Sequence, residues 1–188
     1  MSLPKNSIYG GTTLEKKLPE RKRTRMKYFD FGRNGAYFIT ICTQDRKQIL
    51  SSIIKNSDRT NVGEGLSLPL LTDYGKILEH NIKLINEKYE NVMITQYVIM
   101  PNHIHMILTI MNEYGRENPS PTVSTVVGWL KYQTTKEINS TCKCIDRKIF
   151  QRSFHDHIIR NSDDYDKISK YIYENPLIWE KDCFYSEE

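Results

Sequence analysis

The chain has 188 residues, of which 38% are hydrophobic and 27% are charged, and its formal net charge is +4. The length fits one domain, and the mean hydropathy of -0.58 excludes membrane-spanning and fibrous proteins. The first residues, MSLPKNSIYGG, lack the apolar core of a secretion signal, so we expect a cytoplasmic protein without a membrane partner. The four cysteines are too sparse for a disulfide scaffold, and we expect reduced thiols. They are Cys42, Cys142, Cys144 and Cys183.

The positive charge is concentrated near the N-terminus. Residues 1–33 carry nine Lys or Arg against three acidic residues, a net charge of +6, whereas the rest of the chain carries −2. A dense basic run attracts polyanions by releasing their condensed counterions, although such runs are often only solvated tails. The run contains Arg21, Lys22, Arg23 and Arg25. We therefore divide the chain into a basic N-terminal arm, residues 1–33, and one domain, residues 34–188.

The first half of that domain contains a strand, a loop and a helix. The β-branched and aromatic run at residues 36–43 is typical of a strand in a packed sheet. Residues 51–70 are rich in Ser, Asn, Gly and Pro, which predicts a long loop that could hold a small hairpin. From Thr72, a suitable N-cap, the apolar residues follow the spacing of one helical face for about 17 residues.

The second half contains three strands and two helices. Residues 91–100 and 103–110 predict neighbouring antiparallel strands joined by a tight connection. Ser120, followed by a proline, predicts the start of a second long helix. Alternation within residues 149–160 indicates a fourth strand, and Ser162 is expected to cap a last helix that ends before Pro176.

This order of elements predicts an α+β, ferredoxin-like fold. A split βαβ arrangement forms an antiparallel sheet with helices on one face, and here an additional C-terminal helix follows. We expect the other face of the sheet to be left available for a functional site.

Two histidines alternate along the third predicted strand, in MPNHIHMIL. Because neighbouring side chains on a strand point to opposite faces, His103 and His105 point to the same side. Paired imidazoles can chelate a divalent cation. The alternative is a pair of partly exposed histidines that only form hydrogen bonds with their neighbours.

The last predicted helix offers a phenol and an amide on one edge. Tyr165, Ile168 and Ile172 have the spacing of a core-facing stripe, whereas Tyr171 and Asn175 are i, i+4 neighbours on the adjacent stripe. A tyrosine hydroxyl can attack phosphorus if a cation withdraws charge from the phosphate, and an amide oxygen can help to hold that cation. The alternative is a packing aromatic and a helix C-cap.

The motifs YVIMPNHIH, QRSFHDHIIR, YIYENP and WEKDCFY resemble those of REP-associated tyrosine transposases, a branch of the single-tyrosine HUH transposases of the insertion-sequence type. The resemblance runs from about residue 27 into the C-terminal tail. It implies that His103 and His105 form the HUH motif, that Tyr171 is the nucleophile and that Asn175 is the third metal ligand. It also implies Mg²⁺ or Mn²⁺, although the ligand types alone would tolerate zinc, nickel or copper.

The resemblance implies a DNA transposase that nicks and rejoins hairpin-bearing single-stranded DNA through a 5′-phosphotyrosine. One alternative is a noncatalytic nucleic-acid-binding module on a ferredoxin-like sheet. Another is a metal-dependent hydrolase of a small phosphate compound. The broader group contains dimers that exchange the tyrosine helix, but this branch need not form them, so a homodimer is left open. A general base is not identified.

Other residues are candidates for supporting roles. His155 and His157 form a second alternating pair, which with Cys142 and Cys144 could make a zinc site, but the spacing fits no standard finger. We expect these histidines to be structural or to contact DNA. Outside the arm, the cations that could neutralise phosphates are Lys131, Lys136 and Arg152. The aromatics that could stack on bases, but which more often belong to a core, are Tyr37, Phe38, Trp129 and Tyr132.

Overall fold

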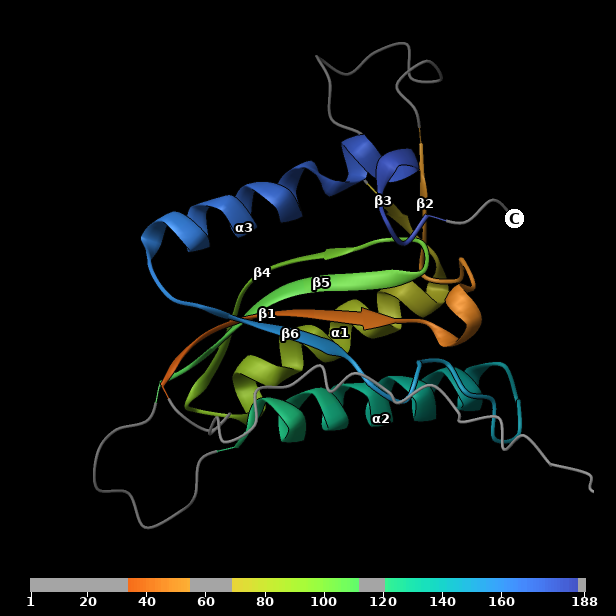
Figure 1. The fold of residues 1–188 in the computed structure, drawn as a ribbon. Helices are drawn as coiled ribbons and strands as arrows, with labels where there is room; N and C mark the ends of the chain where they lie inside the picture. The colour runs from red at the N-terminus through yellow and green to blue at the C-terminus, as the bar shows by residue number, and fades with distance from the viewer. Residues whose placement is uncertain (1–33, 55–68, 112–120, 186–188) are drawn as a thin grey trace, which may run out of the picture.

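The computed structural model describes residues 34–54, 69–111 and 121–185, so the basic arm lies outside the described residues. A four-stranded antiparallel sheet with the order β4-β5-β1-β6 forms its centre (Figure 1). The strands are β1 (Gly35–Cys42), β4 (Val92–Ile99), β5 (His103–Ile110) and β6 (His155–Ile159). The predicted α+β, ferredoxin-like sheet is confirmed.

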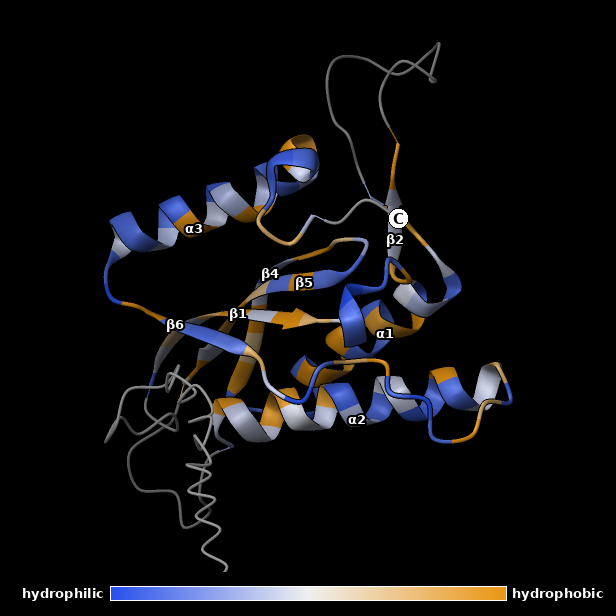
Figure 2. Cartoon of the chain, turned by 45° about the vertical axis from the view of Figure 1, so that its right-hand side comes forward, coloured by the Kyte–Doolittle hydropathy of each residue, from blue (hydrophilic) through white to orange (hydrophobic). Residues whose placement is uncertain are grey.

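The helices occupy both faces of this sheet. Helices α1 (Asp73–Lys88) and α2 (Val123–Thr141) cover one face, and α3 (Ser162–Glu174) lies over the other (Figure 1). The 3-10 helix η3 (Asn175–Lys181) continues from α3. Figure 2 shows that α3 is largely hydrophilic, in agreement with Ile172 as its buried residue. The face opposite α1 and α2 is therefore partly covered by the helix that carries Tyr171.

Three short elements complete the described fold. They are η1 (Gln44–Arg46), β2 (Ser51–Ile53) and β3 (Pro69–Leu71). Strands β2 and β3 pair antiparallel, which agrees with a small hairpin in the segment predicted as a loop. Among the helices of the described residues, none combines the length and apolar character that a membrane span requires.

Strand alternation divides the core into two clusters. Ile104, Met106 and Leu108 of β5 join the larger cluster, which is packed against α1 and α2. Ile107 points the other way and packs in a smaller cluster with Ile172 of α3. His103 and His105 share the parity of Ile107, so they lie on the α3 side of the sheet.

The caps of the helices partly follow the predictions. Thr72 caps α1 as predicted, because its Oγ1 accepts a hydrogen bond from the Gly75 amide at 3.1 Å. The prediction for α2 was wrong: Thr122, not Ser120, is the cap, since its hydroxyl accepts from the Thr125 amide at 3.2 Å. For α3, Asn161 rather than Ser162 is the cap, because its carboxamide oxygen accepts from the Asp164 amide at 2.8 Å.

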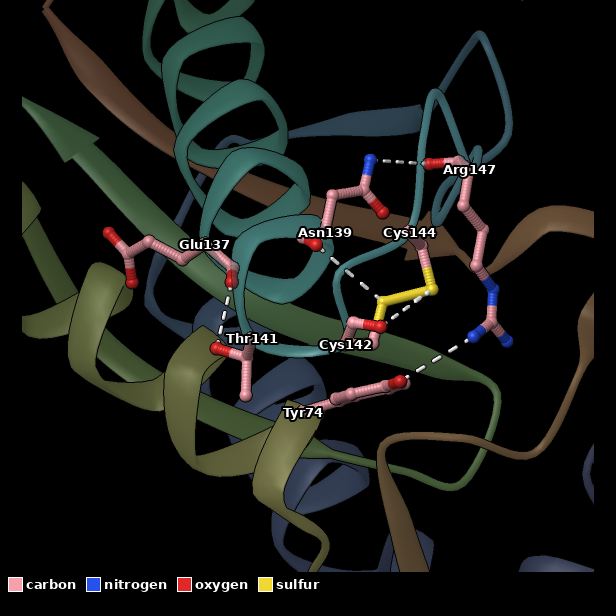
Figure 3. Close-up of a disulfide and its surroundings, with 7 residues drawn as sticks. All are labelled: Tyr74, Glu137, Asn139, Thr141, Cys142, Cys144 and Arg147. Atoms are coloured by element: carbon pink, nitrogen blue, oxygen red, sulfur yellow. Dashed lines mark hydrogen bonds between the residues drawn. A yellow bond between two sulfur atoms is a disulfide. The ribbon is translucent and has the colours of Figure 1, made fainter.

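A disulfide joins Cys142 and Cys144 at the end of α2 (Figure 3), so the expectation of reduced thiols was wrong for this pair. Lys143 between them adopts a left-handed conformation with φ of 52°, and the two Cα atoms lie 5.3 Å apart, within bridging range. The turn is also held by the Asn139 side chain, which donates to the Arg147 carbonyl at 3.1 Å (Figure 3). Cys42 and Cys183 are free.

Candidate active site

The imidazoles of His103 and His105 lie side by side and are buried, with exposed fractions of 0% and 1%. Their Nε2 atoms are 3.0 Å apart. Asn102 fixes one tautomer: its Nδ2 donates to the Phe184 carbonyl, so its Oδ1 accepts from His103 Nδ1 at 2.9 Å. The Nε2 of neutral His103 therefore presents a lone pair toward His105.

The second imidazole has an adaptable partner. Thr40 Oγ1 lies 2.8 Å from His105 Nδ1, and a rotating hydroxyl can either donate to or accept from that nitrogen. Without a cation, a proton on His105 Nε2 relieves the contact with His103 Nε2. If that proton moves to Nδ1, both Nε2 lone pairs face the same point. This arrangement suits a cation bound by both rings.

Burial keeps both imidazoles neutral. It lowers the pKa of His103 to about 4, with Asp182 opposing this change and Arg46 reinforcing it. Burial also lowers the pKa of His105 well below its usual value, and His103 acts in the same direction. A neutral imidazole is the form that binds metal ions, so neither ring has to lose a proton at neutral pH.

Helix α3 brings Tyr171 to the pair. The half-buried phenol has its hydroxyl 3.3 Å from His105 Nε2 and donates to Asp182 Oδ2, also at 3.3 Å. The Phe38 ring stacks on His105 and meets Tyr171 edge-on, with centroid distances of 5.1 and 6.1 Å. Burial and the negative charge of Asp182 raise the pKa of Tyr171. Ionisation of this phenol therefore requires added positive charge or a proton acceptor.

Asn175, one turn after Tyr171, is fully buried. Its Nδ2 donates to Asp182 Oδ2 at 2.6 Å, whereas its buried Oδ1 finds no hydrogen-bond partner among the described residues. A buried carbonyl oxygen without a partner costs free energy unless a water or a cation satisfies it. The orientation of this amide thus agrees with the predicted ligand role.

Asp182, which the sequence analysis missed, also belongs to the site. His103, His105 and Asp182 each offer a ligand atom within 4.8 Å of the others, and this is the group among the described residues that could hold a metal ion. Two neutral imidazoles, a carboxylate and an unpaired amide oxygen fit a divalent cation. The available signal was the acidic pair Glu180 and Asp182 in the tail WEKDCFY, and no ligand spacing distinguished Asp182 from its neighbour.

The segment after α3 covers the imidazoles. The Phe184 ring centroid lies 4.7 Å from that of His103, and Trp179 lies at 5.9 Å. Arg46 places its guanidinium over Phe184 at 5.3 Å and donates to the Cys183 carbonyl at 3.3 Å. These residues had no predicted role, because only the folded tail brings them to β5.

The second histidine pair lies on the edge strand β6 and is exposed. His157 Nε2 lies 3.1 Å from Asp164 Oδ2, a contact between β6 and α3, and nothing comparable is described for His155. The zinc alternative with Cys142 and Cys144 does not form, because the two sulfurs are bonded to each other.

The predicted DNA contacts differ in exposure. Lys131 Nζ donates to the carbonyls of Gln151 and Arg152, and burial lowers its pKa, so it stabilises the segment before β6. The side chains of Lys136 and Arg152 are exposed. Of the four aromatics, Tyr37 is buried, Phe38 and Trp129 are half-buried against the core and Tyr132 is exposed. The arm residues Arg21, Lys22, Arg23 and Arg25 lie outside the described residues.

Comparison with known proteins identifies the family. The sequence profile of the family described as Transposase IS200 like matches residues 31–175, a range that includes both histidines, Tyr171 and Asn175. The chain belongs to this family.

Relatives of this IS200-like transposase occur in Haemophilus influenzae. One, an uncharacterized protein, is 28% identical over 180 residues, which cover 88% of this chain and 93% of that protein. Another, assigned as a REP-associated tyrosine transposase, is 28% identical over 158 residues, or 79% of this chain and 73% of that protein. A solved structure of a REP-associated tyrosine transposase bound to a REP hairpin matches with a TM-score of 0.55 and 25% sequence identity. The match covers 84% of this chain and 73% of that protein chain.

Proposed function

We propose that this IS200-like transposase cleaves and rejoins hairpin-bearing single-stranded DNA through a covalent 5′-phosphotyrosine at Tyr171. The observation that carries the proposal is the Tyr171 hydroxyl 3.3 Å from His105 Nε2, beside two neutral imidazoles. The structural neighbour bound to a REP hairpin supports a hairpin as the DNA partner. A cytoplasmic location stays a prediction, and the sequence leaves the choice between a monomer and a homodimer open.

The reaction exchanges one phosphodiester bond for another. The Tyr171 oxygen attacks phosphorus, the bond from phosphorus to the 3′ oxygen breaks, and that oxygen takes up a proton. The phenolic proton has an acceptor in reach, since Asp182 Oδ2 lies 3.3 Å from the hydroxyl. The phosphotyrosyl bond conserves the energy for rejoining, so no high-energy cofactor is consumed.

His103, His105 and Asn175 are the proposed holders of Mg²⁺ or Mn²⁺. When bound, the cation supplies a Lewis acid for the phosphoryl oxygen and positive charge beside the phenol. Asn102 and Thr40 orient the two imidazoles, and Phe38 packs against His105 and Tyr171. The proposed phosphate contacts outside this centre are the exposed Lys136 and Arg152 and the four cations of the arm, with Lys131, His155 and His157 in supporting positions.

A covalent-adduct assay tests the proposal. The full chain is incubated with Mn²⁺ and a labelled hairpin oligonucleotide that carries a single-stranded extension, and adducts are resolved on a denaturing gel. We expect an adduct that Tyr171→Phe abolishes and Tyr173→Phe retains. Tyr173 is a matched control because it lies in the same motif but is 59% exposed.

Other results would point to the alternatives. Hairpin binding without any adduct would favour the noncatalytic module, and release of free phosphate from small phosphate compounds would favour a hydrolase. An adduct that survives Tyr171→Phe but is lost in Tyr173→Phe would move the nucleophile to the second tyrosine.

A further inference from the structure

We propose that Asp182 is a fourth ligand of the cation site, so that the chain segment following α3 completes the metal centre. This inference rests on the proposed function, in which His103, His105 and Asn175 hold a divalent cation. It adds a charged ligand from outside the two motifs that suggested the site, and it assigns a role to the C-terminal tail.

The position of the carboxylate supports the inference. A ligand atom of Asp182 lies within 4.8 Å of those of both imidazoles. Its Oδ1 accepts from the Phe184 amide at 2.6 Å, and its Oδ2 accepts from Asn175 Nδ2 at 2.6 Å. These bonds hold the carboxylate beside the imidazoles, so its approach to a shared cation requires little rearrangement.

The charge of the site gives a second reason. Two neutral imidazoles and an amide carry no net charge, although they lie in a buried site. A divalent cation there would lack a counter-charge, and an unpaired buried charge is costly. The Arg46 guanidinium, which lies over Phe184 and donates to the Cys183 carbonyl, adds a further positive charge near the site. Asp182 is the anionic group placed to compensate a cation held by this pair.

The ligand set also bears on the choice of metal. Imidazole alone suits zinc, copper and nickel, whereas carboxylate and amide oxygens suit magnesium and manganese. With Asp182, the site has two nitrogen and two oxygen donors. The carboxylate thus shifts the site toward the oxygen-preferring cations.

Ligation by Asp182 couples the metal to the tail. Asp182 belongs to a segment that docks through Phe184 on His103 and through the bond from Asn102 to the Phe184 carbonyl. A cation that binds only when this carboxylate is in place must stabilise the docked segment by mass action. Metal binding and tail docking should therefore rise and fall together.

Isothermal titration of the metal-free full chain with Mn²⁺ tests the inference. Asp182→Asn keeps the size of the side chain and a carbonyl acceptor for the Phe184 amide, but it removes the charge. We expect its Kd for Mn²⁺ to rise at least tenfold. Asp166→Asn is the matched control, an exposed carboxylate on α3, and its Kd should stay within twofold of wild type. A Kd for Asp182→Asn within twofold of wild type would overturn the inference.

Two further variants separate the possible failures. Tyr171→Phe removes the hydrogen bond to Asp182 and keeps the carboxylate, so its Mn²⁺ affinity should match wild type; a tenfold loss would assign the effect to the phenol. His105→Ala should abolish binding. If wild type binds no Mn²⁺, or His105→Ala binds it as well as wild type does, the proposed metal site itself fails. If wild type binds Mn²⁺ and His105→Ala does not, but Asp182→Asn binds as tightly as wild type, the site stands and Asp182 is not a ligand.

A measurement on the wild-type protein covers the case in which Asp182→Asn does not fold. Crystals soaked with Mn²⁺ should show an anomalous peak within coordination distance of His103 Nε2, His105 Nε2 and a carboxylate oxygen of Asp182. A peak bound by the two imidazoles but beyond coordination distance of Asp182 would overturn the inference without any variant.

Discussion

The imidazole of His103 combines burial with hydrogen bonding to a fixed acceptor. Burial disfavours its charged form, and the Asn102 oxygen on one side and His105 on the other hold the neutral ring in place. Burial and these hydrogen bonds favour the neutral ring that binds a metal ion, so protonation of His103 destabilises the fold. Acid should therefore affect the stability of the metal-free protein through this residue.

We predict that the free energy of unfolding, measured in EDTA by urea denaturation, falls as the pH is lowered from about 6.5 toward 4. The pKa of His103 is about 4 in the folded chain against a usual 6.5, so the unfolded chain binds the proton first and the stabilisation is lost as the pH falls. A difference of this size corresponds to about 3 kcal/mol. His103→Gln should flatten the profile, whereas His80→Gln, an exposed position on α1, should not. Parallel profiles for wild type and His103→Gln would contradict the prediction.

Residue patterns predicted part of the site. The two-residue period of a strand places His103 and His105 on one face, and the i, i+4 spacing of a helix places Tyr171 and Asn175 on one edge. Local periodicity does not predict Asp182, because its position depends on the reversal of the chain after α3 and on the packing of the tail over β5. A contact between residues 182 and 103 has no signature in either segment alone.

Among the described residues, the two glycines that lie in helices, Gly75 and Gly128, have opposite environments. A Cβ on Gly75, in the first turn of α1, would overlap the Leu50 carbonyl oxygen. That oxygen also accepts hydrogen bonds from the amide and the hydroxyl of Thr72, so the backbone there cannot easily withdraw. A Cβ on Gly128 of α2 would meet nothing within 4 Å.

We predict opposite effects of the same substitution at these two positions. Gly75→Ala should destabilise the fold by about 2 kcal/mol or more, because the start of α1 must move away from Leu50. Gly128→Ala should stabilise it by about 0.5–1 kcal/mol, because alanine loses less backbone entropy in a helix. Urea denaturation of both variants measures the changes. Equal changes at the two positions would show that the packing around Gly75 is not as described.

The sequence predicted which helices form more accurately than the residues at which they begin. The cap of α1 follows from Thr72, but α2 and α3 begin after Thr122 and Asn161, although Ser120 and Ser162 are also good cap residues. Several adjacent polar residues can cap a helix, and the fold selects the one whose oxygen reaches the free amides. The Cys142 to Cys144 bond likewise depends on the turn at Lys143, which composition does not reveal.

In the whole molecule, the excess positive charge and the candidate active site lie in different parts of the chain. The arm, residues 1–33, carries +6, whereas the remainder, which contains the candidate site, carries −2. A polyanion such as DNA is therefore not attracted by the net charge of the domain. If the chain binds single-stranded DNA as proposed, the arm should supply much of the salt-dependent part of the binding free energy.

We predict that changing Arg21, Lys22, Arg23 and Arg25 together to Gln weakens hairpin binding. The negative slope of log K against log salt concentration should lose up to about 3 of its magnitude, as expected for four lost phosphate contacts. Fluorescence anisotropy with a labelled hairpin at several salt concentrations measures both quantities.

The matched control is the double variant Lys76→Gln and Lys83→Gln on α1. This helix lies on the sheet face opposite α3, and the two lysines form ion pairs with Asp73 and Glu79. Its slope should change by less than about 1. An unchanged slope in the arm variant would show that residues 1–33 are a solvated tail, and the phosphate contacts would then have to come from the domain.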